Sequence, residues 1–216
     1  MSRSSSNLSQ RLYGLYLILD ERWDSQRPLD AVLKIAATQG VRLFQYRNKA
    51  GSAQEVYEKA LRLCQLAHDA HALFLLNDRC DIALAIDADG VHLGQEDLPL
   101  DLARKLMGQK IIGISTHAPH EVQGATEGGA DYLGFGPVFS TATKRDHEPI
   151  VGLAGLTTVR ALTSLPIFAI GGITEHSIEQ VQLAGANGAA VASAVLDAFD
   201  LESAIRPFMT CVWPTS

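Results

Sequence analysis

Eight short apolar segments recur along the chain, and this repetition limits the possible folds more than any other feature of the sequence. Longer stretches with helical periodicity separate them, which is the pattern of repeated βα units around a parallel sheet. Several are nearly unbroken runs of Ile, Leu and Val, as expected for strands that are buried on both faces. The expected strands are Leu15–Leu19, Val41–Tyr46, Leu73–Leu76, Gly90–Leu93, Ile111–Ile114, Tyr132–Phe135, Ile167–Ile170 and Gly188–Val191.

The stretches between these segments are amphipathic. In Ala53–Ala70, apolar residues recur at the spacing of one helix face: Val56, Ala60, Leu63 and Ala67. Eight strand signals, each followed by a helical signal, predict a closed (β/α)8 TIM barrel. An open, doubly wound sheet is the alternative, but it usually has fewer strands, and no GxGxxG motif follows the first strand here.

The composition suits a single globular domain. The chain has 216 residues, of which 47% are hydrophobic and 19% charged, and it contains no linker-like or low-complexity segment. We therefore expect a polar N-terminal extension at residues 1–11, a barrel catalytic domain at residues 12–208 and a C-terminal tail at residues 209–216.

Net charge and cysteine usage limit the possible partners and the cellular compartment. The formal net charge of -6 argues against a nucleic-acid partner, because nucleic-acid-binding domains usually carry a basic stripe. Cys64, Cys80 and Cys211 are far apart and form no CxxC pair, which favours a reducing compartment. The first apolar run, Leu12 to Leu19, is too short to span a bilayer. We expect a cytoplasmic protein with no membrane partner, and its composition is compatible with a homo-oligomer.

Polar residues follow the expected strands repeatedly. In a barrel of this type the active site is built at the carboxyl ends of the strands, so functional residues are expected there. One Asp or Asn in such a place is commonly only a helix cap or turn former, and this applies to Asn77 and Asp78 taken alone. The repetition along one rim favours a site. The segments are Gln45 to Lys49, Asn77 to Arg79, His92 to Asp97, Ser115 to His117, Thr141 to Arg145, Gly171 to Gly172 and Ala192 to Ser193.

The residue types on this rim suit phosphate and a metal ion. Arg47, Lys49 and Lys144 are cations that can bind phosphate oxygens. Asp78 and Asp97 follow successive strands and offer hard oxygen ligands. Because Mg²⁺ is typically held by one or two carboxylates together with substrate phosphates, this pair predicts a magnesium site beside a pyrophosphate.

A second anion site is expected after the last two strands. Gly171 and Gly172 let backbone N–H groups approach an anion, and Ala192 and Ser193 open the next helix, whose N-terminus favours a phosphate. Phosphate sites at this place recur among barrels, so the signal indicates phosphate but says little about the reaction.

The chain resembles the thiamine-phosphate synthases from Gly14 to about Phe199. The Gly-Gly element after the seventh strand is common among phosphate-binding barrels, whereas the HLGQ-E-D and F-x-T-x-T-K strings are much more specific. The resemblance is carried by Gln45 to Lys49, Asn77-Asp78, Gly90 to Asp97, Gly113 to His117, Gly134 to Phe139, Thr141 to Lys144, Ala169 to Ile173 and Ala192-Ser193.

This resemblance implies a role for each site residue. The aminopyrimidine diphosphate would be bound by Gln45, Tyr46, Arg47, Asn48, Lys49, Asn77, Ser115 and Lys144. Within this set the resemblance implies catalytic roles for Arg47, Ser115 and Lys144, with Ser115 touching the pyrimidine. Asp78 and Asp97 would hold Mg²⁺. The thiazole phosphate or its carboxylated form would be bound by Thr141, Ala142, Thr143, Gly172, Ala192 and Ser193.

The implied reaction matches this residue inventory. Loss of pyrophosphate from the CH₂ group of the pyrimidine would leave a cation that the amino-substituted ring stabilises, and the thiazole nitrogen would then attack it. Such a dissociative step needs charge stabilisation on the departing pyrophosphate rather than a strong general base. We therefore expect Lys144→Ala and Asp97→Ala to lower turnover greatly while leaving the fold intact.

Other functions stay open at this stage. A thiazole tautomerase of similar sequence would need neither the diphosphate cations nor the metal carboxylates, and His117 would be its candidate proton carrier. A non-catalytic thiazole-phosphate sensor would bind ligand without turnover. A Schiff-base lyase is disfavoured because no lysine lies inside an expected strand, and the His117-x-x-His120 spacing offers no third metal ligand nearby.

Overall fold

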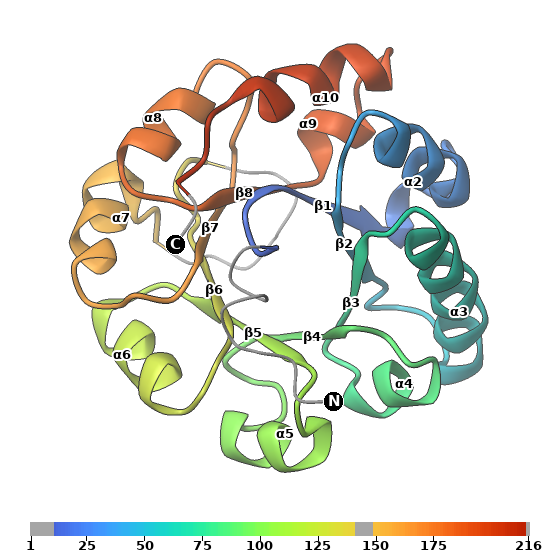
Figure 1. Cartoon of the computed structure of the whole chain (residues 1–216), viewed down its shortest axis with the longest axis horizontal. Coiled ribbons are helices and arrows are strands. Elements are labelled where there is room, and N and C mark those ends of the chain that lie inside the picture. The colour runs from blue at the N-terminus through green and yellow to red at the C-terminus, as the bar shows by residue number, and fades with distance from the viewer. Residues whose placement is uncertain (1–10, 141–148, 215–216) are drawn as a thin grey trace.

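A computed structural model describes residues 11–140 and 149–214 of the chain. Its eight strands form a closed barrel in sequence order, and all neighbouring strands are parallel (Figure 1). The barrel closes where Gly14 of the first strand pairs with Gly188 of the last. The strands are β1 (Gly14–Asp20), β2 (Leu43–Arg47), β3 (Leu73–Asn77), β4 (Gly90–Leu93), β5 (Ile111–Thr116), β6 (Tyr132–Phe135), β7 (Ile167–Ile170) and β8 (Gly188–Val191).

The predicted (β/α)8 TIM barrel is therefore confirmed, and four of the strand ranges agree residue for residue. The differences lie at strand ends. The second strand begins at Leu43 rather than Val41, while β1, β3 and β5 extend to Asp20, Asn77 and Thr116. These added residues are polar, so a search for apolar runs stops one or two residues before the backbone pairing does.

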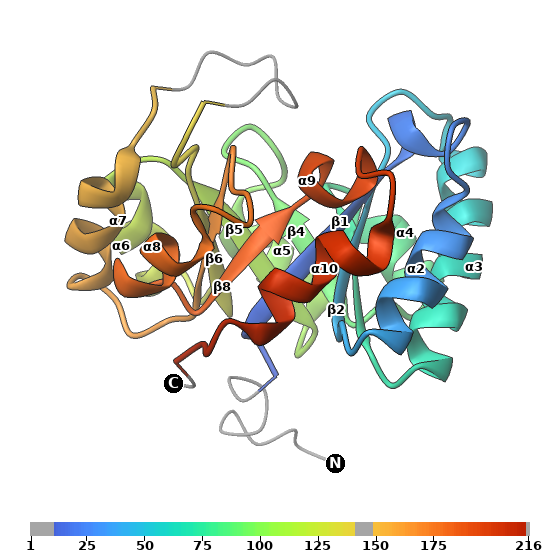
Figure 2. The ribbon, with the colours of Figure 1, turned by 90° about the horizontal axis from the view of Figure 1, so that it is seen from above.

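Helices surround the barrel on all sides, as Figures 1 and 2 show. Local signals set their ends. At the start of α3, Oγ of Ser52 accepts from the backbone N–H of Glu55 at 3.3 Å, and Oε2 of Glu55 accepts from the N–H of Ser52 at 2.8 Å. This reciprocal capping satisfies two N–H groups that the helix cannot pair internally. The helices are η1 (Glu21–Trp23), α2 (Leu29–Thr38), α3 (Ala53–Asp69), α4 (Cys80–Ala85), α5 (Leu100–Met107), α6 (Pro119–Glu127), α7 (Gly152–Arg160), α8 (Ile178–Leu183), α9 (Ser193–Leu196) and α10 (Leu201–Thr210).

Two apolar layers hold these elements together. The larger lies between the strands and the helices, and the smaller fills the barrel interior. In the interior, the rings of Tyr16, Tyr132 and Phe168 meet edge to face, with centroids 5.2 to 5.8 Å apart. These rings close the barrel beneath its carboxyl end, so the barrel has a packed floor rather than a pore.

Glycines on the strands make room for these rings. A Cβ on Gly113 would lie 2.0 Å from Cζ of Tyr132, and one on Gly188 would lie 2.5 Å from Cε1 of Phe168. No side chain fits at such distances without moving the ring. The interior aromatics therefore depend on glycine at the facing strand positions.

The last helix continues past the expected boundary between residues 208 and 209, since α10 ends at Thr210. Trp213 is buried and donates from Nε1 to the carbonyl of Phe208 at 3.3 Å, and Asn187 donates from Nδ2 to the carbonyl of Pro214 at 3.1 Å. This part of the expected tail thus packs against the amino end of the barrel. Within residues 11–140 and 149–214, no helix is long and apolar enough to cross a membrane.

Candidate active site

A cavity of about 640 Å³ lies at the carboxyl ends of the strands, above the aromatic floor. It brings together residues from all eight strand ends that are separated by up to nearly 180 positions in sequence. Ten of the expected site residues line it: Gln45, Arg47, Lys49, Asn77, Asp78, Asp97, Ser115, Gly172, Ala192 and Ser193. The expected contributions of Thr141, Ala142, Thr143 and Lys144 lie outside the described residues.

Two expected substrate-binding residues, Tyr46 and Asn48, are not among the residues that line the cavity. Side chains alternate along a strand, so when Gln45 and Arg47 face the barrel interior, Tyr46 faces the helices. Its hydroxyl donates to Oε2 of Glu21 at 2.8 Å. Asn48 closes the following turn, where its Oδ1 accepts from the backbone N–H of Gly51 at 2.8 Å. Both residues therefore support the β2 end from outside the cavity.

Asp20 is a buried carboxylate in the cavity wall that the sequence analysis missed. It is 2% exposed, and its Oδ2 accepts from Nη1 of Arg47 at 2.7 Å while its Oδ1 accepts from Nε of Arg22 at 2.9 Å. Burial alone would raise the pKa of Asp20, but the hydrogen bonds and charge of the two guanidinium groups lower it below its usual value. Its position directly after the first apolar run was the available signal.

Lys49, Asp78 and Asp97 form a cluster in the loops that follow the neighbouring strands β2, β3 and β4. Nζ of Lys49 lies 2.6 Å from Oδ2 of Asp78, and the side chains of Asp78 and Asp97 share a hydrogen bond. The backbone N–H of Gly94 donates to Oδ2 of Asp97 at 2.7 Å. Asp78 has a φ of 62°, and its N–H donates to the carbonyl of His92, so the turn after β3 is held against β4.

The two carboxyl groups have opposite pKa shifts. Burial, together with the hydrogen bond to Asp97, raises the pKa of Asp78. Burial would also raise that of Asp97, but the hydrogen bonds from Asp78 and from the Gly94 N–H lower it. A pair of touching carboxyl groups must share a proton or bind a cation, because two bare carboxylates repel one another.

This donor set fits Mg²⁺. Within the described part of the chain, no cluster of three or more His, Cys, Asp or Glu side chains could hold a metal on its own. Magnesium, however, rarely uses a complete protein cage and takes its remaining ligands from water and substrate phosphates. Two ionised carboxylates at Asp78 and Asp97 would carry more negative charge than Lys49 alone neutralises, and a divalent cation would offset the excess.

The cavity also has uncharged polar groups. Nε2 of Gln45 donates to the hydroxyl of Tyr16 at 2.6 Å, and Oγ of Ser115 lies 2.9 Å from Nε2 of His92. Tyr16 and His92 both line the cavity, and the sequence analysis assigned no role to either. His117 also lines it, with its Nδ1 3.4 Å from a carboxylate oxygen of Glu121.

The loops after β6 and β7 approach each other so closely that glycine is required between them. A Cβ on Gly172 would lie 2.3 Å from the carbonyl oxygen of Ser140, and Gly171 and Gly172 both have positive φ, at 97° and 63°. Side chains are disfavoured there by conformation as well as by space. The same region has an apolar wall that includes Phe139 and Ile150, which the search for polar residues did not detect.

Comparisons with known proteins agree on one family. The sequence model of the thiamine monophosphate synthases matches residues 15–195. The thiamine-phosphate synthase of Chloroflexus aurantiacus is 44% identical over 198 residues, which cover 92% of each chain. The corresponding enzyme of Halalkalibacterium halodurans is 45% identical over 93% of this chain and 95% of its own.

A solved structure agrees with these sequence relatives. The thiamine phosphate pyrophosphorylase of Pyrococcus furiosus superposes with a TM-score of 0.86 at 37% identity, covering 94% of this chain and 96% of its own. The 3-hexulose-6-phosphate synthase of Salmonella typhimurium, at 19% identity and a TM-score of 0.66, shares the fold alone.

Proposed function

The chain belongs to the thiamine monophosphate synthase family, and we propose how the groups around its cavity carry out that family's reaction. The enzyme is a transferase of thiamine biosynthesis. It condenses 4-amino-2-methyl-5-(diphosphooxymethyl)pyrimidine with a 4-methyl-5-(2-phosphooxyethyl)thiazole, giving thiamine phosphate and pyrophosphate. The distribution of charge around the cavity supports a specific placement of the two substrates.

The diphosphate belongs beside β2, β3 and β4. Arg47 and Lys49 supply positive charge there, and Asp78 and Asp97 lie in contact with one another. This cluster of two touching carboxyls beside two cations is the observation that carries the proposal. Asp78 and Asp97 would hold Mg²⁺, which when bound supplies positive charge to the diphosphate oxygens.

The remaining groups act on the organic parts of the substrates. Gln45 and Ser115 offer hydrogen bonds to the aminopyrimidine from the cavity floor, and Asn77 at the end of β3 also lines the cavity. The thiazole phosphate would lie toward Gly172, Ala192 and Ser193. With the substrates bound in this way, the thiazole nitrogen would approach the pyrimidine methylene from the side away from the departing group.

The chemical step is a substitution at that methylene carbon. Its C–O bond to the diphosphate breaks, and the electron pair leaves with pyrophosphate. The lone pair of the thiazole nitrogen then forms the new C–N bond, and the product ring keeps the positive charge. Arg47, Lys49 and, as expected from sequence, Lys144 stabilise the charge on the departing oxygens. Loss of one preorganised contact of this kind typically costs about 3 to 4 kcal/mol of barrier.

The direct test is to mix the purified protein with both substrates and Mg²⁺ and to follow thiamine phosphate and pyrophosphate together. Both products should form, formation should stop on chelation, and Asp97→Asn should lower turnover by about a hundredfold or more. Binding of thiazole phosphate with no pyrophosphate release would instead support the tautomerase or the sensor. Product formation that continues unchanged after chelation would contradict the proposed magnesium site.

We also propose a cytoplasmic enzyme whose partners are its small-molecule substrates. The support is that Cys64, Cys80 and Cys211 are all free thiols, with burial raising the pKa of each. A homo-oligomer is compatible with this proposal, and light scattering at several protein concentrations would establish the oligomeric state.

A further inference from the structure

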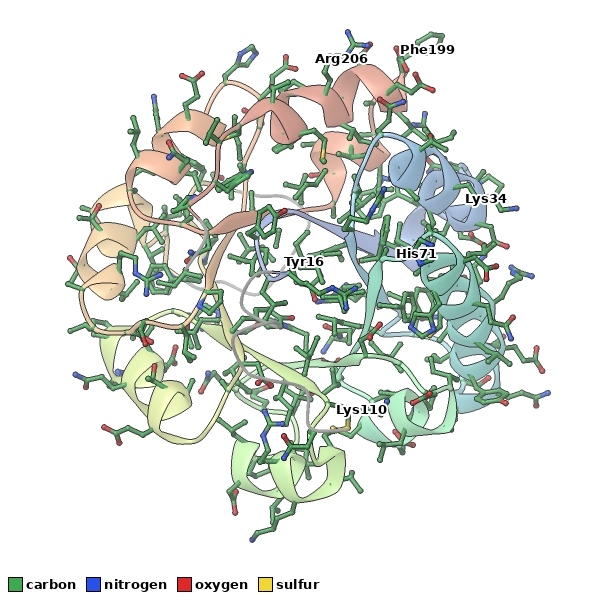
Figure 3. The ribbon with its side chains drawn as sticks, in the orientation of Figure 1. Tyr16, Lys34, His71, Lys110, Phe199 and Arg206 are labelled. Atoms are coloured by element: carbon green, nitrogen blue, oxygen red, sulfur yellow. The ribbon has the colours of Figure 1, made fainter. Side chains whose placement is uncertain are left out.

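A continuous chain of hydrogen bonds runs through the barrel interior beneath the cavity, from Gln45 to Ser115. Gln45 Nε2 lies 2.6 Å from Tyr16 Oη, and Tyr16 Oη lies 2.8 Å from Tyr132 Oη. Tyr132 Oη lies 2.8 Å from His92 Nδ1, and His92 Nε2 lies 2.9 Å from Ser115 Oγ. Figure 3 shows Tyr16 within the ring of strands. These hydrogen bonds therefore link five strands in the order β2, β1, β6, β4 and β5. Two of the links, from β1 to β6 and from β6 to β4, join strands that are not neighbours in the sheet.

Burial makes every link of this chain necessary. Tyr16 and Tyr132 are 1% and 0% exposed, so neither hydroxyl can turn to bulk water for a partner. Burial raises the pKa of both phenols, so both remain protonated donors at neutral pH. A buried hydroxyl without a partner is costly, and each hydroxyl has one proton, so it can donate only once. The direction of one bond therefore sets the direction of the next.

The direction follows from the Gln45 end. Because Gln45 Nε2 donates to Tyr16, the Tyr16 hydroxyl donates to Tyr132, and Tyr132 donates to Nδ1 of His92. An imidazole that accepts at Nδ1 carries its proton on Nε2 when neutral, so it donates to Oγ of Ser115. The hydroxyl proton of Ser115 is then directed to the cavity, while Oε1 of Gln45 serves as an acceptor.

This order is complementary to one edge of an aminopyrimidine. The exocyclic amino group is a donor for Gln45, and the adjacent ring nitrogen is an acceptor for Ser115. Sites built from such paired polar groups discriminate strongly, because a ligand with the wrong pattern leaves buried groups unpaired. The hydrogen-bonding character of Gln45 and Ser115 is thus coupled through the protein interior.

We propose that Tyr132 is a positioning residue for the pyrimidine site, an inference that rests on the proposed function. It is not among the cavity-lining residues, yet it is the central link between Tyr16 and His92. Its hydroxyl maintains the donor and acceptor order with which Gln45 and Ser115 meet the aminopyrimidine.

The surrounding strands are built to hold this ring. Tyr132 pairs in register with Gly113 of β5, where a Cβ would come within 2.3 Å of the Tyr132 hydroxyl oxygen. Its ring stacks on the imidazole of His92 at a centroid distance of 5.5 Å and an interplanar angle of 29°. At Gly134, a Cβ would lie 3.1 Å from Cε1 of His92. The two linked rings thus occupy space that the absence of two side chains provides.

The test is Tyr132→Phe, which deletes the hydroxyl and keeps the ring. The KM for the aminopyrimidine diphosphate should rise about tenfold, while the KM for the thiazole phosphate stays within twofold. The control is Tyr57→Phe on the surface of α3, where the side chain is 38% exposed, and both KM values should be unchanged there. In a Ser115→Ala background, Tyr132→Phe should raise the KM for the aminopyrimidine diphosphate little further, because the hydrogen bond at the Ser115 end of the series is already lost.

A second measurement makes the link testable without substrate. In ¹⁵N-labelled free enzyme, His92 should be the Nε2–H tautomer, and Tyr132→Phe should shift it toward a mixture of tautomers. If Tyr132→Phe unfolds the protein, Tyr16→Phe breaks the same chain at its neighbouring link. An unchanged tautomer together with unchanged KM values would overturn the inference. Absence of turnover in the wild-type enzyme would instead overturn the proposed function. The tautomer measurement would then still test whether the Tyr132 hydroxyl sets the tautomer of His92.

Discussion

Nη1 of Arg47 lies 2.7 Å from Oδ2 of Asp20, and this ion pair joins the last residues of two neighbouring strands. The side chain of Asp20 is 3% exposed and that of Arg47 is 23% exposed. The buried carboxylate therefore holds one side of the guanidinium, while Arg47 still lines the cavity. A guanidinium has five N–H donors, so Arg47 can keep this bond and still bind phosphate oxygens. Asp20 thus orients the cation to which we assign the diphosphate.

We predict that Asp20→Asn weakens binding of the aminopyrimidine diphosphate. The amide keeps the shape of the carboxylate but removes the charge that orients Arg47, so the KM for this substrate should rise several-fold, and the KM for the thiazole phosphate should change much less. Steady-state kinetics with each substrate varied in turn would measure both. The matched control is Asp81→Asn, which breaks a comparable pair with Arg79 at the exposed start of α4. An equal rise in both KM values would contradict the orienting role.

The ion pairs of Asp20 also predict that the stability of the folded protein depends on pH. Arg22 and Arg47 lower the pKa of folded Asp20, whereas its unfolded pKa is about 3.9. The carboxylate therefore stabilises the folded state above the unfolded pKa, and this contribution is lost as the pH falls through the folded pKa. Urea unfolding at pH 7 should show Asp20→Asn less stable than wild type by about 2 kcal/mol, and the difference should shrink at pH 3. A difference that is independent of pH would rule out this electrostatic origin.

Lys49 should serve the diphosphate rather than the metal. Its ammonium lies 2.6 Å from Asp78 and opposes the approach of Mg²⁺ to the same carboxylate. In Lys49→Met, we expect the KM for the diphosphate to rise about tenfold, and Mg²⁺ without substrate to bind as tightly as in wild type or more tightly. Calorimetric titration with Mg²⁺ and steady-state kinetics would separate these effects. Lys105→Met, at a 75% exposed side chain on α5, is the control. Weaker Mg²⁺ binding by Lys49→Met would contradict the assignment.

Gly113→Ala should destabilise the fold. The added Cβ would lie 2.0 Å from a carbon of the Tyr132 ring, and that ring packs on Tyr16 and Phe168 with no open space to enter. Overpacking of this kind typically costs about 1 to 3 kcal/mol. The control is Gly124→Ala in α6, where a Cβ meets nothing within 4 Å and should stabilise the helix by about 0.5 to 1 kcal/mol. Thermal unfolding of both variants would show opposite shifts in Tm.

Much of the fold could be predicted from sequence because its signals are local. A strand such as Ile167–Ile170 is a short apolar run, and such a run identifies a doubly buried strand wherever it packs. The proximity of Asp78 and Asp97 could also be predicted, since these residues follow successive strands whose carboxyl ends meet at one rim. Tyr46 was assigned to the substrate as part of the segment Gln45 to Lys49 that carries the resemblance. Alternation along β2 directs its side chain toward the helices, where its hydroxyl donates to Glu21.

The amino-acid sequence by itself determined the order of the strands, the end of the barrel that carries the site and the chemical types gathered there. The tertiary structure alone decided which side chains touch. Tyr16 and Tyr132 are 116 residues apart, and their hydroxyl groups meet because barrel closure and strand register aim both rings at the same interior layer. Asp20 and Arg47 become partners in the same way, through the register of β1 on β2. Such contacts depend on the geometry of the closed sheet, which no local pattern encodes.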